Sequence, residues 1–98
     1  MIIEEQDFRM TQISENSPFW DLELLKTIRP KGKEARQEMT NAGYGMTLPS
    51  CIRAITAFRV HNNHPDDSVT LKQYLSEYIS ELQKLDKSLG YVEPREDQ

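Results

Sequence analysis

The sequence predicts an α+β domain in which a three-stranded antiparallel sheet is followed by two helices, in the order β-β-β-α-α. Two observations carry this prediction. Apolar residues alternate as in strands before the stretch Gly43-Tyr44-Gly45-Met46-Thr47-Leu48-Pro49, and after it they recur every three or four positions, as in helices. The stretch itself holds two glycines, which permit a sharp bend between sheet and helices.

Three segments of the first half have the composition of strands. A short strand is expected within residues 2–13, followed by a turn at residues 15–18. Residues 19–28 alternate most clearly, with Trp20, Leu22 and Leu24 on one face and acidic residues on the other. A longer basic loop over residues 29–33 then leads to a weaker third strand, residues 35–42, which is mostly polar.

Two helices are expected in the second half. Thr47 is a good N-cap for the first helix, and Pro49 is tolerated in its first turn. This helix should end near residues 61–63, because Pro65 disfavours helical geometry just before it.

The second helix carries the strongest local signals. Thr70 and Gln73 form a capping box at its start, and Gly90 is placed to end it in a left-handed C-cap. Between them lies one wide apolar face. The predicted common core consists of Trp20, Leu22, Leu24, Ile52, Ile55, Leu75, Ile79 and Leu82.

Length and composition indicate one small domain over residues 1–90, with a charged tail at 91–98 that we expect to be disordered. No run approaches the roughly 20 apolar residues that a membrane helix needs, and the N-terminus lacks a signal pattern. The single cysteine, Cys51, allows no internal disulfide. We therefore expect a cytoplasmic protein with no membrane partner.

Charge is unevenly distributed. The chain carries a formal net charge of −4, made up of −3 in residues 1–20, +3 in residues 21–60 and −4 in residues 61–98. An acidic chain is poorly suited to general DNA binding, but the basic middle leaves a local contact open. The acidic ends suit a basic protein surface.

Three motifs offer candidate chemistry, and each has a simpler structural explanation. The pair His61 and His64, with Asp66 and Asp67 nearby, supplies metal-type ligands, but the histidines straddle a helix end. Cys51 lies in the first turn of a helix, but no histidine lies near it in the chain to act as a base. The Gly-Tyr-Gly-x-Thr turn precedes a helix but lacks the P-loop pattern. We expect no metal, no cofactor and no catalysis.

Two sets of charged residues are candidates for contact with a partner. The basic set is Lys31, Lys33 and Arg36, and the acidic set on the second helix is Glu77, Glu81 and Asp86. A nucleic-acid partner would use the basic set. A protein partner with a basic groove would use the acidic set, and the larger acidic excess of residues 61–98 favours it.

The chain also resembles a group of short phage and prophage proteins of uncharacterised function. The resemblance rests on the turn G-Y-G-M-T-L-P-S-C-I at residues 43–52, an Arg-containing helix end at 58–61 and the helix start T-L-K-Q-Y-L at 70–75, and it spans roughly residues 8–89. It implies a sheet followed by two helices, and no functional residue can be transferred from it. Because small proteins of such phage clusters include anti-CRISPR inhibitors, the resemblance implies a non-enzymatic protein that binds a host protein, such as a defence nuclease. The alternative is a nucleic-acid-binding accessory or regulatory protein that uses the basic loop over residues 26–36.

Overall fold

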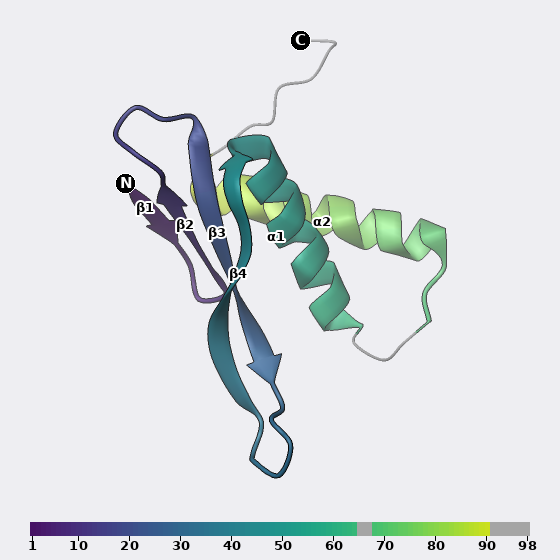
Figure 1. Ribbon diagram of the computed structural model, residues 1–98. Coiled ribbons are helices and arrows are strands. Elements are labelled where there is room, and N and C mark those ends of the chain that lie inside the picture. Colours follow the sequence, from purple (N-terminus) through teal and green to yellow (C-terminus); the bar gives the residue numbers. More distant parts are fainter. Residues whose placement is uncertain (65–67, 91–98) are drawn as a thin grey trace. The chain divides into compact units, whose positions relative to one another are not determined.

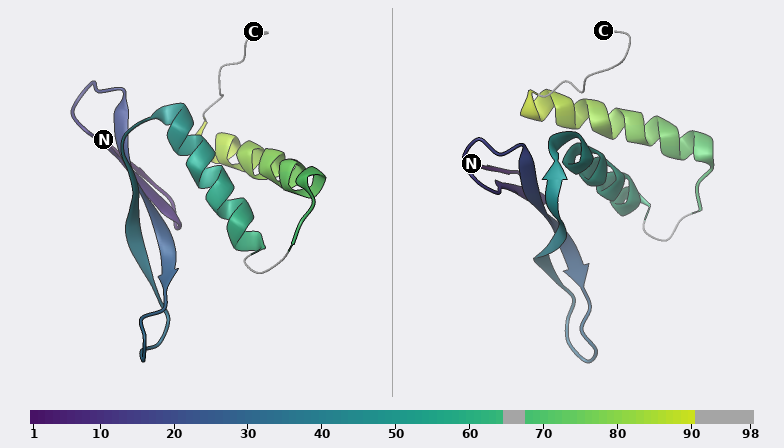
Figure 2. Two further views of the ribbon diagram at one scale, coloured as in Figure 1. Left: turned by 45° about the vertical axis from the view of Figure 1, so that its right-hand side comes forward. Right: turned by 45° about the horizontal axis from the view of Figure 1, so that its top comes forward.

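The computed structural model describes residues 1–64 and 68–90, which form four strands and two helices (Figures 1 and 2). The elements are β1 (Ile2–Glu4), β2 (Phe8–Gln12), β3 (Phe19–Ile28), β4 (Arg36–Thr47), α1 (Leu48–Asn63) and α2 (Leu71–Leu89). The chain divides into two compact units, Met1–Cys51 and Ile52–Gln98, and each is described by itself. The α+β class is confirmed, whereas the predicted count of three strands is wrong.

The additional strand arises because the first predicted strand is a hairpin. β1 and β2 pair antiparallel, with Ile3 opposite Met10. In the turn between them, the Glu5 N–H donates to the Phe8 carbonyl at 3.1 Å, and the Leu25 N–H of β3 donates to the Asp7 carbonyl at 2.8 Å. Residues 5–7 include neither glycine nor proline, so no breaker signal marks this turn in the sequence.

The sheet is an antiparallel meander in the order β1-β2-β3-β4. Directly opposed residues share a face, and the pairs Phe8 with Leu24 and Met10 with Leu22 are buried. The opposite face of β2 is polar: Arg9 Nε donates to Glu4 Oε2 at 2.9 Å. The predicted alternation of β3 is therefore confirmed, with Trp20 on the buried face as well.

The glycines expected between sheet and helix lie inside β4, which extends to Thr47 instead of ending at residue 42. The register of β4 against β3 shifts twice between Trp20 and Glu23, so β4 contains bulges there. Gly45 has φ of 60°, and its N–H donates to Asp21 Oδ1 at 3.1 Å. Glycine tolerates this left-handed conformation, so the bulge needs no break in the strand.

The predicted helix caps are confirmed. The Ser50 N–H donates to Thr47 Oγ1 at 3.4 Å, as an N-cap requires. Thr70 and Gln73 form the capping box of α2, and Gly90 ends α2 with φ of 67°. The predicted tail, residues 91–98, lies outside the described residues. The expectation that both helices cover the sheet concerns the two units together and stays a prediction.

The predicted core is wrong at two positions of α2, and at a third, Leu82, the side chain is only half-buried. Leu75 is 49% exposed and Ile79 is 54% exposed, whereas Leu85 is completely buried. The apolar face of α2 is wider than its less exposed strip, in which Tyr74 and Tyr78 are half-buried and Leu85 is buried. A helical pattern shows that a face is apolar but does not show which part of a wide face is covered.

This difference predicts unequal costs for two identical truncations in α2. Leu85→Ala should lower the free energy of unfolding by about 2–5 kcal/mol, because it leaves a cavity at a buried position. Leu75→Ala should cost about 1 kcal/mol, because half of its surface is already in water. Urea unfolding followed by circular dichroism measures both, and equal losses would contradict this burial pattern.

Candidate functional site

The most distinctive feature of the sheet unit is a two-stranded arm formed by residues 25–39. The last residue of β3 that pairs with β2 is Leu24, opposite Phe8. Beyond it β3 is in register with β4 alone, from Leu25 opposite Met39 to Ile28 opposite Arg36, and the Leu25 N–H that donates to the Asp7 carbonyl marks the base of the arm. The arm therefore extends past the rest of the sheet, as Figures 1 and 2 show.

The tip of the arm is a tight turn. The Lys33 N–H donates to the Pro30 carbonyl at 3.1 Å. Gly32, at the third position of this turn, has φ of 76°, and a Cβ added there would meet no atom within 4 Å. The left-handed conformation is the one that a type II turn needs at this position. The turn therefore presents Lys31 and Lys33 at the end of the arm.

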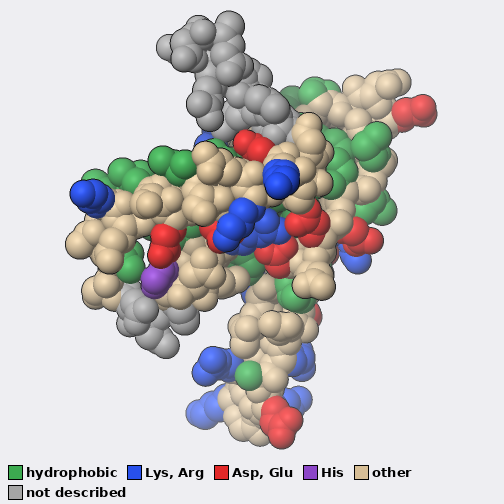
Figure 3. Space-filling model, turned by 180° about the vertical axis from the view of Figure 1, so that it is seen from behind, with side chains coloured by type: hydrophobic (Ala, Val, Ile, Leu, Met, Phe, Trp, Pro, Cys, Tyr) green, Lys and Arg blue, Asp and Glu red, His purple; other side chains and the backbone are tan. Residues whose placement is uncertain are grey.

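The arm carries five basic side chains, and all of them are exposed. They are Lys26, Arg29, Lys31, Lys33 and Arg36. Figure 3 shows Lys and Arg side chains on both sides of the projecting arm. The structure thus brings the predicted basic set together on one exposed element.

Glu38 balances part of this charge in a way that the sequence did not reveal. It lies opposite Lys26 in the strand register, and its Oε2 accepts from Arg36 Nε at 3.1 Å. Opposed charges on neighbouring strands attract each other, although at exposed positions the gain is small. The basic residues of the tip lie outside the strand register and farthest from Glu38 along the arm, and the acid of the tip is Glu34, which follows Lys33 in the chain.

The predicted acidic set of α2 has a different environment. Glu77 contacts His64, with its two carboxylate oxygens 2.6 and 2.7 Å from His64 Nε2. The Glu81 side chain is only 15% exposed and lies 3.4 Å from Lys84 Nζ. Asp86 is half-buried. Glu77 and Glu81 therefore contact groups of their own unit.

The same contact bears on the candidate metal site. His61 is exposed, whereas His64 is held by Glu77, and Asp66 and Asp67 lie outside the described residues. In the described part of the chain, no three His, Cys, Asp or Glu side chains gather closely enough to hold a metal ion. The expectation of no metal stays a prediction.

Cys51 has the environment of a core residue. Its side chain is fully buried in the first turn of α1. Burial raises the pKa of the Cys51 thiol from 9.0 to about 11, because the thiolate would lose its hydration. A buried, protonated thiol is a poor nucleophile at neutral pH.

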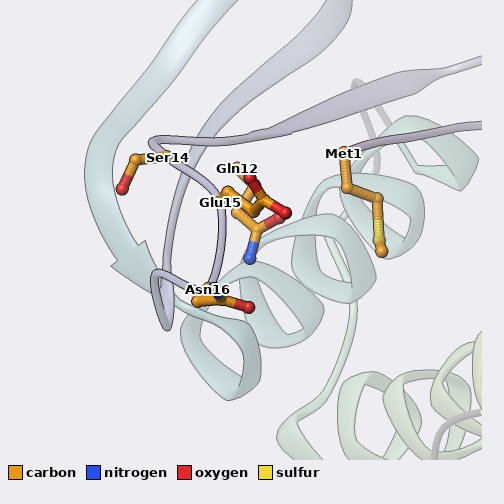
Figure 4. Close-up of a pocket in the computed structure, with 5 residues that line it drawn as sticks. All are labelled: Met1, Gln12, Ser14, Glu15 and Asn16. Atoms are coloured by element: carbon orange, nitrogen blue, oxygen red, sulfur yellow. The ribbon is translucent and has the colours of Figure 1, made fainter.

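One hollow of about 540 Å³ lies beside the turn between β2 and β3 (Figure 4). It is lined by Met1, Gln12, Ser14, Glu15 and Asn16. Figure 4 shows that Ser14 points away from the other labelled side chains, and the Gln12 amide already donates to the Ser17 carbonyl at 2.8 Å. Glu15 is the sole ionisable side chain among these lining residues.

Sequence reasoning missed an exposed apolar row on α2. Its members are Leu71, Leu75 and Ile79, which are 72%, 49% and 54% exposed and follow one another at four-residue intervals. The width of the apolar face could have indicated this row, because the face is wider than the part of α2 that is covered.

Comparison of the chain with protein-family models, curated proteins and solved structures finds no significant match. The resemblance to small phage proteins therefore stays an expectation. Over residues 1–64 and 68–90, neither helix has a stretch long and apolar enough to cross a membrane.

The environment of Cys51 predicts a protected thiol. At pH 8 the native protein should react with a thiol reagent far more slowly than the urea-unfolded chain, because the thiol is buried and protonated. Since folding raises the pKa, the contribution of this thiol to stability is complete below pH 9.0 and is lost as the pH rises towards about 11.

Comparison with Cys51→Ala isolates that contribution from other groups that titrate in this range. The stability of the wild type should fall more steeply between pH 9.0 and about 11 than that of the variant. Rapid, stoichiometric labelling of the folded wild type at pH 8 would contradict the buried environment.

Proposed function

We propose that this protein is a non-enzymatic nucleic-acid-binding protein whose contact is the arm of residues 25–39. The single observation that carries the proposal is the gathering of five exposed cations on one projecting element. Nucleic-acid affinity comes largely from Lys and Arg side chains that neutralise phosphates and release counterions.

Charge distribution favours the arm over any other part of the chain as the contact. Residues 25–39 carry a net charge of +3, so the remainder of the chain carries −7. A polyanion is attracted to the arm and repelled by the remainder, because Coulomb forces act over about 10 Å at moderate salt. This pattern supports a local contact rather than a broad basic footprint.

The proposal predicts a steep dependence of affinity on salt. If the arm neutralises three to five phosphates, the logarithm of the association constant should fall by about 3 to 4.5 for each tenfold rise in salt. Changing Lys31, Lys33 and Arg36 together to Glu should abolish binding. Fluorescence anisotropy with a short labelled duplex measures both effects.

A matched control separates position from net charge. Changing Lys72, Lys84 and Lys87 to Glu alters the net charge by the same amount at three exposed positions of α2. This variant should retain most of the affinity of the wild type. Equal losses in the two triple variants, or no binding by the wild type at low salt, would refute the proposal.

A second candidate function is binding to a partner protein, with inhibition of a host defence nuclease as the expected role. The observation that favours it is the apolar row of Leu71, Leu75 and Ile79, whose exposure is high for side chains of this kind. The acids Glu77, Glu81 and Asp86 remain predicted contacts for this partner, although the bond to His64 occupies one of them.

Variants of α2 test the second candidate. Leu75→Gln with Ile79→Gln should abolish capture of the partner from nuclease-treated host lysate, because it removes apolar contact area. Ser76→Gln with Ser80→Gln places the same residue type at two exposed positions one residue further along, and it should not affect capture. A captured protein that both double variants retain, or that nuclease treatment removes, would contradict this role.

A further inference from the structure

We infer that the arm of residues 25–39 enters the major groove of B-form DNA as a two-stranded ribbon. This inference rests on the proposed function and specifies the nucleic acid and the groove. The observations that carry it are the shape of the arm, the positions of its charges and the kinds of side chain that it carries and lacks.

The shape of the arm matches the major groove. From Leu25 opposite Met39 to Ile28 opposite Arg36, β3 pairs with β4 and no longer with β2, although the Leu25 N–H at the base of this segment still donates to the Asp7 carbonyl. The major groove, about 12 Å wide and 8.5 Å deep, admits a two-stranded ribbon, whereas the minor groove is only about 6 Å wide. The three residue steps of this paired segment span about 10 Å, so the ribbon with its turn can reach the groove floor.

The positions of the charges suit such an insertion. Lys26 and Arg36 lie on the paired part of the arm, and Arg29, Lys31 and Lys33 lie at its end. An inserted ribbon would therefore have cations near the phosphates that border the groove and others near base edges. Lys and Arg are the side chains that most often bind the guanine O6 and N7 acceptors in this groove.

The side chains that the arm lacks point to a duplex rather than a single strand. Residues 25–39 include no Phe, Tyr, Trp or His. Proteins that bind single strands stack the bases on aromatic rings, so the arm could offer a single strand only charge. The apolar residue of the tip, Pro30, is half-buried and not fully presented as a wedge of the kind that opens the minor groove.

The same reasoning separates DNA from RNA. The major groove of an A-form RNA duplex is deep and narrow, and protein side chains cannot read it. The arm should therefore prefer a B-form DNA duplex to an RNA duplex of the same sequence, although both present the same phosphate charge.

The first test compares the full chain on three labelled probes of equal length: a DNA duplex, an RNA duplex and a single DNA strand. We expect the DNA duplex to bind at least several-fold more tightly than the other two, and to show protection of guanine N7 from dimethyl sulfate, because N7 faces the major groove. A minor-groove ligand such as netropsin should not compete.

A charge-neutral variant tests whether the shape of the tip matters. Gly32→Val forces a β-branched residue to φ of 76°, so it should distort the turn without changing any charge. We expect it to lose N7 protection and several-fold affinity for the DNA duplex, with weak binding to the single strand unchanged. Ala35→Val, in the same loop, should keep N7 protection, and circular dichroism verifies that both variants fold.

The outcomes distinguish this inference from the proposed function. Equal affinity for all three probes, or competition by netropsin without N7 protection, would overturn the major-groove inference while nucleic-acid binding through the arm stands. Loss of N7 protection in both Gly32→Val and Ala35→Val would also overturn it. Absence of binding to every probe at low salt would overturn the proposed function itself.

Discussion

The sheet unit depends on the unequal lengths of β2 and β3. β3 has ten residues, but the five residues of β2 pair with it only from Leu24 back to Trp20. Along this paired half, Trp20, Leu22 and Leu24 are buried on one face. Lys26 has the same parity along the strand but lies past the end of β2 and is exposed. The face of β3 therefore changes from apolar to charged at the same point where its pairing with β2 ends.

Because β2 is short, the arm of residues 25–39 stays exposed to solvent. A strand with a neighbour on each side has its backbone N–H and C=O groups paired within the sheet, and one of its faces can pack against a core. β3 and β4 beyond Leu24 have each other as partners, which holds the arm together by backbone hydrogen bonds, while no buried apolar cluster forms there. Charged side chains are tolerated on such an element because their heads stay in water.

Local contacts alter the conclusion drawn from the net charge of each region of the chain. The acidic excess of the C-terminal region favoured an acidic contact surface on sequence grounds. In the structure, Glu77 contacts His64 and Glu81 is mostly covered, so part of that charge is engaged within its own unit. Among the cations of the arm, Arg36 is the one bonded to a carboxylate, and its partner Glu38 lies on the same strand. The availability of a charge thus depends on its neighbours more than on its sign.

Local signals in the sequence were sufficient for most of the individual elements. The caps at Thr47, Thr70 and Gly90 and the alternation of β3 depend on interactions within a few residues, and the structure has them where they were predicted. Two local features were hidden. The turn at residues 5–7 has no glycine or proline, and Gly45 sits in a bulge where Asp21, 24 residues away in the chain, accepts its N–H.

By itself, the sequence determined the α+β class, the helix boundaries and the basic character of residues 26–36, because these follow from periodicity, capping and composition. Only the tertiary structure decided the strand count, the burial of α2 and the isolation of the arm. Each of these depends on which residues become neighbours across the chain. The exposure of Leu75 depends on which residues pack against α2. The exposure of Lys26 depends on where β2 ends. Neither can be read from a local pattern in the sequence.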